Sequence, residues 1–169
     1  MKYDTIIIGS GQAGNPLSES LTDQGLKVAL IEKAHLGGTC INTGCTPTKT
    51  MVASAQVAHY ARNAARWGVH TSKVRVSLPR IVARKDGIVR RFRGGHQRKV
   101  NSRENLHLYR GHARFLGPRQ VAVGKRVLES ERIFINTGTR TDIPLIEGLE
   151  KGTYLNSVRV AEQPLQGGQ

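Results

Sequence analysis

Two cysteines, Cys40 and Cys45, are the only thiols in the chain, and four residues separate them. They lie in a glycine-containing stretch, and an alanine-rich segment that predicts a long helix begins directly after them. A helix N-terminus stabilises a thiolate through its unpaired amides and its dipole. Lys49, one turn into this helix, adds positive charge. The placement therefore suits thiolate chemistry, either attack on a disulfide or binding of a soft metal ion.

Three interpretations of this pair compete: a zinc site, two inert buried thiols, and a redox couple. A structural zinc site needs four ligands. The histidines, which show no paired spacing that would complete such a site, are His35, His59, His70, His96, His107 and His112. Inert thiols would not need the flanking glycines and lysine. We therefore favour the redox couple and expect no metal site, and a non-catalytic soft-metal binder stays open as an alternative.

The segment before the cysteines predicts a strand, a helix and a second strand. Residues 5–8 form a short isoleucine-rich run that is typical of a buried parallel strand. In the predicted helix, Leu17 and Leu21 share one face, and Gly25 marks the end. Residues 27–32 form the second strand. This order is that of a βαβ unit.

Three glycines and one acidic residue in this unit indicate dinucleotide binding. Gly9 permits a tight turn, Gly11 lets a pyrophosphate approach the backbone, and Gly14 lets helix and strand pack closely. The helix N-terminus offers amides and a positive dipole end to the phosphates. Glu32 ends the second strand, where its carboxylate can bind ribose hydroxyls and would repel a 2′-phosphate. The site thus suits FAD or NAD rather than NADP.

The segment Gly38–Lys49 closely resembles the active-site segment of class I pyridine nucleotide-disulfide oxidoreductases, which include dihydrolipoamide dehydrogenase, glutathione reductase and mercuric reductase. The whole stretch Gly9–Lys49 is similar to that family in order and spacing. Gly111–Phe115 and Asn136–Arg140 also resemble its FAD-domain motifs. The resemblance covers most of the chain and weakens after about Leu155.

The resemblance implies FAD as cofactor and NAD(P)H as the electron donor, with electrons passing through the flavin to the Cys40–Cys45 pair. Cys40 would be the thiol that exchanges with substrate, Cys45 would face the flavin, and Lys49 would sit beside its ring. The substrate would be a small disulfide or a soft metal, with lipoamide, glutathione and mercuric ion all open. The residues that would lie along FAD are Gly9, Gly11, Ala13, Gly14, Glu32, Lys33, Thr39, Cys40, Lys49, Ala113, Thr137 and Gly138.

The fold implied is α/β, a Rossmann-like FAD-binding domain with a parallel sheet and a small antiparallel β insertion. The short strands expected in that antiparallel sheet are Leu106–Tyr109, His112–Leu116, Gln120–Val123 and Arg126–Leu128. Arg132–Asn136 is expected to return as a buried strand. Residues 1–155 form a partial FAD-binding domain, and residues 156–169 a weakly ordered end. The family's NAD(P) and dimerisation domains have no counterpart here, so we expect a truncated, catalytically incomplete form.

Basic residues dominate the chain, which carries a formal net charge of +14. Many fall in residues 80–99, inside a predicted helix over residues 78–100 that Gly94-Gly95 would loosen. Apolar residues recur there at helical spacing, so we interpret the charges as a solvated face with the arginines pointing outward. A basic nucleic-acid-binding module is the alternative, but Phe92 is the one aromatic available for base stacking in that segment.

The N-terminal apolar run ends at Gly9, which is too short for a cleavable signal, and no stretch is long enough to span a bilayer. We therefore expect a cytoplasmic protein with no membrane partner, in which a permanent structural disulfide is not expected. Full-length members of the resembled family are homodimers. The sequence does not favour a nucleic-acid partner.

Overall fold

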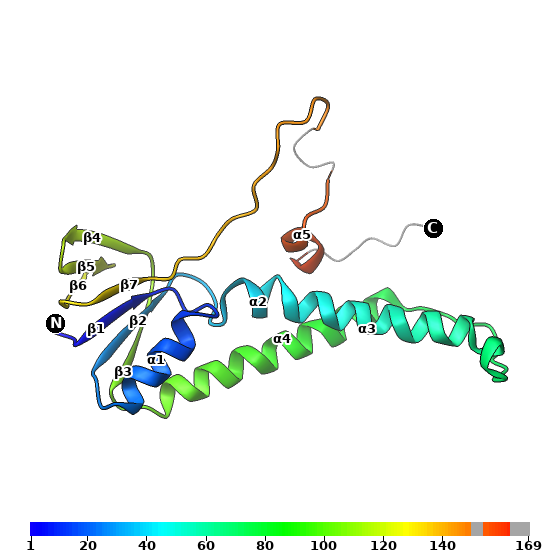
Figure 1. Cartoon of the computed structure of the whole chain (residues 1–169), viewed down its shortest axis with the longest axis horizontal. Coiled ribbons are helices and arrows are strands. Elements are labelled where there is room, and N and C mark those ends of the chain that lie inside the picture. Colours follow the sequence, from blue (N-terminus) through cyan, green and yellow to red (C-terminus); the bar gives the residue numbers. More distant parts are fainter. Residues whose placement is uncertain (150–153, 163–169) are drawn as a thin grey trace. The chain divides into compact units, whose positions relative to one another are not determined.

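The computed structural model describes residues 1–149 and 154–162. The chain divides into two compact units (Figure 1), and each is described by itself. Unit 1 comprises residues 1–41 and 91–140, and unit 2 comprises residues 42–90 with the segment from Thr141 onward.

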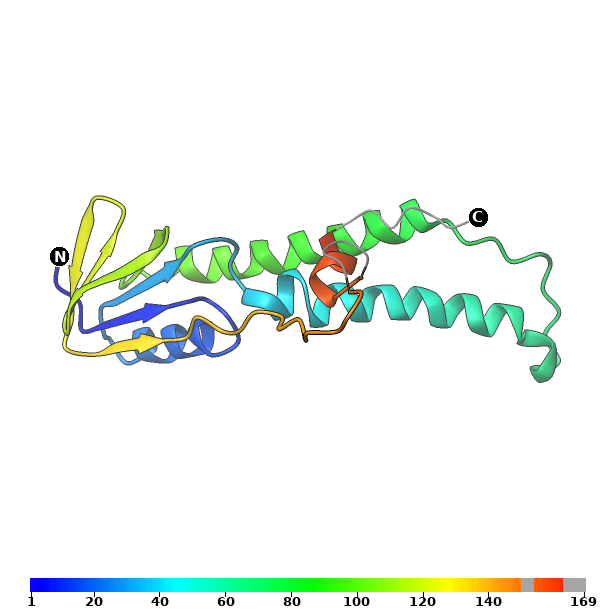
Figure 2. The ribbon, with the colours of Figure 1, turned by 90° about the horizontal axis from the view of Figure 1, so that it is seen from above.

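A four-stranded parallel sheet forms the centre of unit 1, with the strand order β3-β2-β1-β7. Figure 2 shows β1 (Thr5–Ile8) between β2 (Val28–Glu32) and β7 (Ile133–Ile135). Every residue of β1 and β2 is buried, as expected for strands covered on both faces. The predicted βαβ unit is confirmed, with α1 (Gly14–Asp23) as its helix.

The two faces of this sheet bury separate hydrophobic clusters, because successive strand side chains point to opposite faces. Ile7 packs with Leu30 and Val100 on one face, where Leu17 and Leu21 of α1 also pack. The other face is covered by a three-stranded antiparallel sheet of β4 (Ala113–Gly117), β5 (Gln120–Val123) and β6 (Arg126–Glu129). The predicted α/β fold with an antiparallel insertion is therefore confirmed.

Two strand predictions were wrong in detail. β3 (Leu106–Arg110) was expected in the antiparallel sheet, but it pairs in parallel with β2, with Leu106 opposite Val28. A long helix precedes it, and such a crossover is what a parallel neighbour requires. β7 was expected to be buried, yet it lies at the edge of the sheet, where Ile135 is 63% exposed.

The helices also differ from expectation in three places. The segment before Cys45, expected as a loop, contains the short helix α2 (Gly38–Asn42). Helix α4 (Leu78–Asn101) continues through Gly94-Gly95 without a break. Lys85 was expected on an outward face, but it is buried.

Unit 2 is built on α3 (Cys45–Arg62), the single-turn η1 (Ala64–Trp67) and the first part of α4. Arg84 joins two of these helices, because its Nη1 donates to the carbonyl of Thr50 at 3.0 Å. Lys85 Nζ donates to the carbonyl of Ala161 at 2.6 Å. Ala161 belongs to α5 (Ser157–Glu162), a helix that the sequence did not predict.

The predicted frayed end at residues 163–169 lies outside the described residues. Within the described residues, no helix is both long and apolar enough to cross a membrane.

Candidate dinucleotide and dithiol site

The glycine-rich turn after β1 can be built only from glycine at two of its positions. Gly9 has φ +103°, and a Cβ there would lie 2.2 Å from the carbonyl oxygen of Asn136. A Cβ on Gly14 would lie 1.8 Å from the carbonyl oxygen of Gly9. The turn therefore packs directly against the end of β7 and against the first turn of α1, as the predicted roles of these glycines require.

Glu32 is buried at the end of β2 and accepts three hydrogen bonds. Its Oε2 accepts from the backbone amide of Ser10 at 3.0 Å and from the Ser10 hydroxyl at 2.5 Å. Its Oε1 accepts from the amide of Ala34 at 2.8 Å. The predicted ribose-binding carboxylate thus faces the glycine-rich turn and is fixed there by protein donors.

The chain that leads to Cys40 lies against this turn. The amide of Gly37 donates to the carbonyl of Ser10 at 3.0 Å. Gly38 has φ +59°, and a Cβ on it would lie 2.6 Å from the Cα of Gly11. α2 therefore starts in contact with the dinucleotide turn, and Cys40 is half-buried within its five residues.

Gly11 keeps an open side, which is the feature a pyrophosphate needs. A Cβ on Gly11 would meet a single neighbour within 4 Å, the Cα of Gly38 at 3.9 Å. The protein itself thus tolerates a methyl group here, whereas a phosphate approaching the backbone would not. This cradle fits FAD, with the free amides of the α1 N-terminus available to the phosphates.

Asn136 and Ser10 belong to the site, although the sequence did not predict either side chain. The Asn136 Nδ2 is buried and has no hydrogen-bond partner among the described residues. The backbone amide of Asn136 donates to the carbonyl of Ile8 at 2.8 Å, which continues the β1–β7 pairing toward the turn. The residue after the first glycine of the fingerprint faces the acid that ends the next strand, but the fingerprint does not specify that this residue is a serine.

The remaining predicted cofactor residues occupy varied positions. Thr137 follows β7 and comes close to the turn, with its Cα 3.4 Å from a Cβ built on Gly9. Ala113 packs against the hydrophobic cluster beneath the antiparallel sheet, so burial alone explains its small side chain. Those that lie exposed at or near the turn and β7 are Ala13, Lys33, Thr39 and Gly138. Their contacts with FAD stay predictions.

The second cysteine opens a helix. Cys45 is the first residue of α3 and is exposed, and Lys49 is exposed one turn further on. No side chain caps this helix at Gly44, so the helix N-terminus at Cys45 keeps unpaired amide donors and its dipole, although Pro47 contributes no amide hydrogen. Cys40 belongs to unit 1, and Cys45 with Lys49 belongs to unit 2. No disulfide joins Cys40 and Cys45 in this structure.

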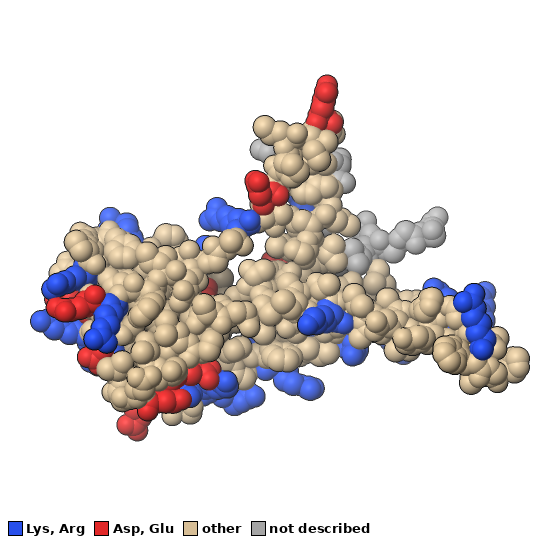
Figure 3. Space-filling view, in the orientation of Figure 1, with Lys and Arg blue, Asp and Glu red and all other residues tan. Residues whose placement is uncertain are grey.

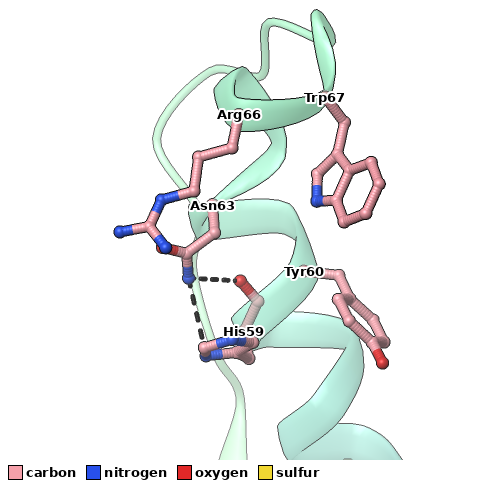
Figure 4. A pocket seen from close by; sticks show the side chains of 5 residues that line it. All are labelled: His59, Tyr60, Asn63, Arg66 and Trp67. Atoms are coloured by element: carbon pink, nitrogen blue, oxygen red, sulfur yellow. Dashed lines mark hydrogen bonds between the residues drawn. The ribbon is translucent and has the colours of Figure 1, made fainter.

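A separate pocket lies in unit 2, and none of the predicted site residues lines it. Its lining residues, drawn in Figure 4, are His59, Tyr60, Asn63, Arg66 and Trp67. No group of three or more His, Cys, Asp or Glu side chains within residues 1–149 and 154–162 is arranged to hold a metal ion.

Comparison with protein families settles the family. The model of the pyridine nucleotide-disulphide oxidoreductases matches residues 3–168. The chain belongs to this family. The resemblance inferred from Gly38–Lys49 and the α/β flavoprotein fold are therefore confirmed, and the chain is part of an oxidoreductase family.

Relatives within the family carry several names. The chain is 34% identical over 160 residues to a mercuric reductase of Lysinibacillus sphaericus, covering 95% of this chain and 29% of that protein. It is 35% identical over 137 residues to a dihydrolipoyl dehydrogenase of Thermus scotoductus, covering 81% of this chain and 29% of that protein.

A solved structure of the family also superimposes on the chain. The flavoprotein disulfide reductase RclA from Escherichia coli, in a Cu(II) complex, matches with a TM-score of 0.75 at 32% identity. The match covers 97% of this chain and 35% of that one. The chain thus spans about a third of the length of these family members.

Proposed function

We propose that this chain supplies the ADP-binding half of an FAD site and the redox thiol pair of a disulfide or mercuric reductase. The observation that carries the proposal is the contact between Gly38 and Gly11, which brings the helix of Cys40 against the dinucleotide turn. Because the helix that carries Cys40 begins at this turn, the Cys40 thiol is positioned to react with a cofactor that the turn binds.

FAD, when bound, supplies a two-electron carrier that can reduce a disulfide. The chain's own part is to hold it: the amides at the start of α1 and the open side of Gly11 would take the pyrophosphate, and Glu32 the ribose. Ser10 and Ala34 keep the Glu32 carboxylate in place with their amides.

Thiol–disulfide exchange is the step for which the pair is suited. The Cys40 thiolate would attack one sulfur of a small disulfide, forming a mixed disulfide and releasing the first thiolate. The Cys45 thiolate would then attack the Cys40 sulfur, forming the Cys40–Cys45 disulfide and releasing the second thiolate. Return of this disulfide to two thiols takes two electrons and two protons, and two-electron reduction is the chemistry that FAD would supply there.

The start of α3 favours the anion that this chemistry needs. Cys45 occupies a helix N-terminus with unpaired amides, and Lys49 places a cation one turn away. Both effects stabilise a thiolate over a thiol. In this proposal Cys40 is the exchange thiol, Cys45 is the thiol nearest the flavin, and Lys49 lies beside the ring.

The electron donor and the substrate are proposed for the complete reductase. The chain spans 29% of the mercuric reductase it matches, and in this proposal NAD(P)H binding and full turnover are assigned to the complete reductase. The substrate class is a small disulfide or a soft metal ion, which both react with thiolates. Reduced thiols of this kind suit the cytoplasm.

FAD titration of the full chain, followed by desalting and an absorption spectrum, tests the proposal. We expect retained flavin in the unmodified chain. Gly11→Ala should fold normally, because the added methyl meets nothing closer than 3.9 Å, yet lose FAD because the methyl blocks the pyrophosphate. Gly117→Ala, where an added Cβ also meets nothing within 4 Å, is the matched control and should keep FAD. Equal retention by the Gly11 variant would contradict the proposal.

A further inference from the structure

Two aromatic side chains stand out of unit 2 near the end of α3. Tyr60 is 64% exposed and Trp67 is 81% exposed. Figure 4 shows their rings on the same side of the helix, with His59, Asn63 and Arg66 lining the rest of the pocket. Two large aromatic side chains therefore face solvent together.

The backbone around this pocket is fixed by local hydrogen bonds. Asn63 donates from its backbone amide to the carbonyl of His59 at 3.1 Å and from its Nδ2 to the same carbonyl at 2.8 Å. Gly68, with φ +74°, ends the η1 turn that carries Trp67. The Tyr60 and His59 rings lie edge-to-face, with a centroid distance of 6.0 Å. The two exposed rings are therefore presented by an ordered turn.

The chain segment that carries the pocket is strongly basic. Residues 42–90 hold a single acidic residue, Asp86, and its carboxylate pairs with Lys85 at 2.7 Å. The nine basic residues of the same segment are Lys49, Arg62, Arg66, Lys73, Arg75, Arg80, Arg84, Lys85 and Arg90. No salt bridge found among the described residues involves Arg62, Arg66, Lys73 or Arg75. Figure 3 shows Lys and Arg, and no acidic side chain, at this end of the helices on the face drawn.

We propose that this pocket binds single-stranded nucleic acid, with unpaired bases stacked on Tyr60 and Trp67 and the backbone phosphates on Arg66 and its basic neighbours. Exposed aromatic faces within a cationic surface are the two components of sequence-tolerant single-strand binding. The basic segment at residues 80–99 offers a single Phe, Tyr or Trp side chain, Phe92, rather than a pair. The aromatic pair supplies what that segment does not. This site is independent of the FAD proposal.

Two other occupants fit the same surface less well. A membrane-bound helix needs a continuous apolar face. Around the circumference of α3, the exposed side chains of Lys49 and Gln56 lie between those of Val52 and Val57 and so interrupt such a face. A second copy of the chain would bring two basic surfaces together, which like-charge repulsion opposes. A polyanion with planar bases satisfies both the charge and the rings.

The chain offers a direct probe, because Trp67 is its single tryptophan. Titration with a single-stranded oligothymidylate should quench its fluorescence, since stacking places a base on the indole. In anisotropy titrations with a labelled oligonucleotide, Tyr60→Ala and Trp67→Ala should each weaken binding by about fivefold or more. Arg66→Gln should lower the slope of log K against log salt by about 0.7.

Matched variants separate this site from general charge attraction. Phe115→Ala removes an exposed aromatic from β4, and Arg98→Gln removes an exposed cation from the unit 1 part of α4. Both should leave binding close to that of the unmodified chain. Thermal melts of all variants should coincide, because both aromatic side chains are mostly exposed.

Four results would overturn the proposal. They are equal affinity in the aromatic variants, equal losses in the Arg98 variant, equal affinity for a polyphosphate without bases, and quenching of Trp67 by phosphatidylserine vesicles or by self-association but not by the oligonucleotide.

Discussion

Glu32 and Ser10 are joined by two hydrogen bonds, from the Ser10 amide at 3.0 Å and from its hydroxyl at 2.5 Å. The carboxylate at the end of β2 therefore holds the dinucleotide turn in place through the protein alone. A hydrogen bond to a charged group contributes roughly 1.5–3 kcal/mol, more than one between neutral groups. The site is thus organised by its own residues.

Glu32→Ala should destabilise the fold as well as weaken FAD binding. The substitution leaves the Ser10 and Ala34 amides without their acceptor, at a cost of about 2 kcal/mol. Urea denaturation measures this free energy of unfolding. Glu104→Ala, at an exposed position, should change it by less than about 0.5 kcal/mol. Equal effects of the two substitutions would show that the Glu32 hydrogen bonds contribute nothing.

Gly38→Ala should damage both stability and FAD binding, because its Cβ would lie 2.6 Å from the Gly11 Cα. A control substitution at Gly25 separates the effect of this steric contact from that of backbone strain. Gly25 also has a positive φ, +83°, but an added Cβ there meets nothing within 4 Å. Gly25→Ala should therefore cost only about 1–2 kcal/mol of conformational strain. A urea midpoint for Gly38→Ala no lower than that of Gly25→Ala would count against the close packing of α2 on the turn.

His96 should make the fold less stable in mild acid. Burial lowers the pKa of His96, the charge of Lys99 lowers it further, and Glu19 partly offsets them. Because the unfolded chain then binds the proton more readily, the free energy of unfolding falls as the pH drops below about 6.5, until the folded-state pKa is passed. Urea unfolding at pH 7.5 and 5.0 should show a smaller loss in His96→Gln. The same loss in both proteins would assign the effect to other groups.

Lys85→Met should loosen α5. The substitution removes the Nζ donor from the carbonyl of Ala161, a bond of 2.6 Å. Hydrogen exchange of the amides in residues 157–162 should become faster, while the sheet amides of β1 keep their protection. Arg80→Met, at an exposed position of the same helix, is the control. Unchanged exchange in α5 would show that this bond does not hold the helix.

Local patterns were enough to predict the βαβ unit and its glycines. Gly9 and Gly14 lie where backbone meets backbone, a requirement that sequence spacing carries directly. The partner of Leu106–Arg110 was missed, because a short apolar run does not reveal which strand it pairs with. The burial of Lys85 depends on α5, which lies 72 residues further along the chain and has no strong sequence signal.

Side-chain partners in the site were equally hidden. Ser10 occupies a variable position of the glycine pattern, so the pattern does not specify the hydroxyl that donates to Glu32. The exposed pair Tyr60 and Trp67 could not be separated from core aromatics, since helical spacing alone does not say which face is covered.

The absorption spectrum of the FAD-loaded chain during dithiothreitol titration tests the central claim most directly, because it detects a thiolate against the flavin. We predict a long-wavelength charge-transfer shoulder on reduction in the unmodified chain and in Cys40→Ser, and none in Cys45→Ser. A shoulder that persists in Cys45→Ser, or a chain that keeps no flavin after desalting, would contradict the account.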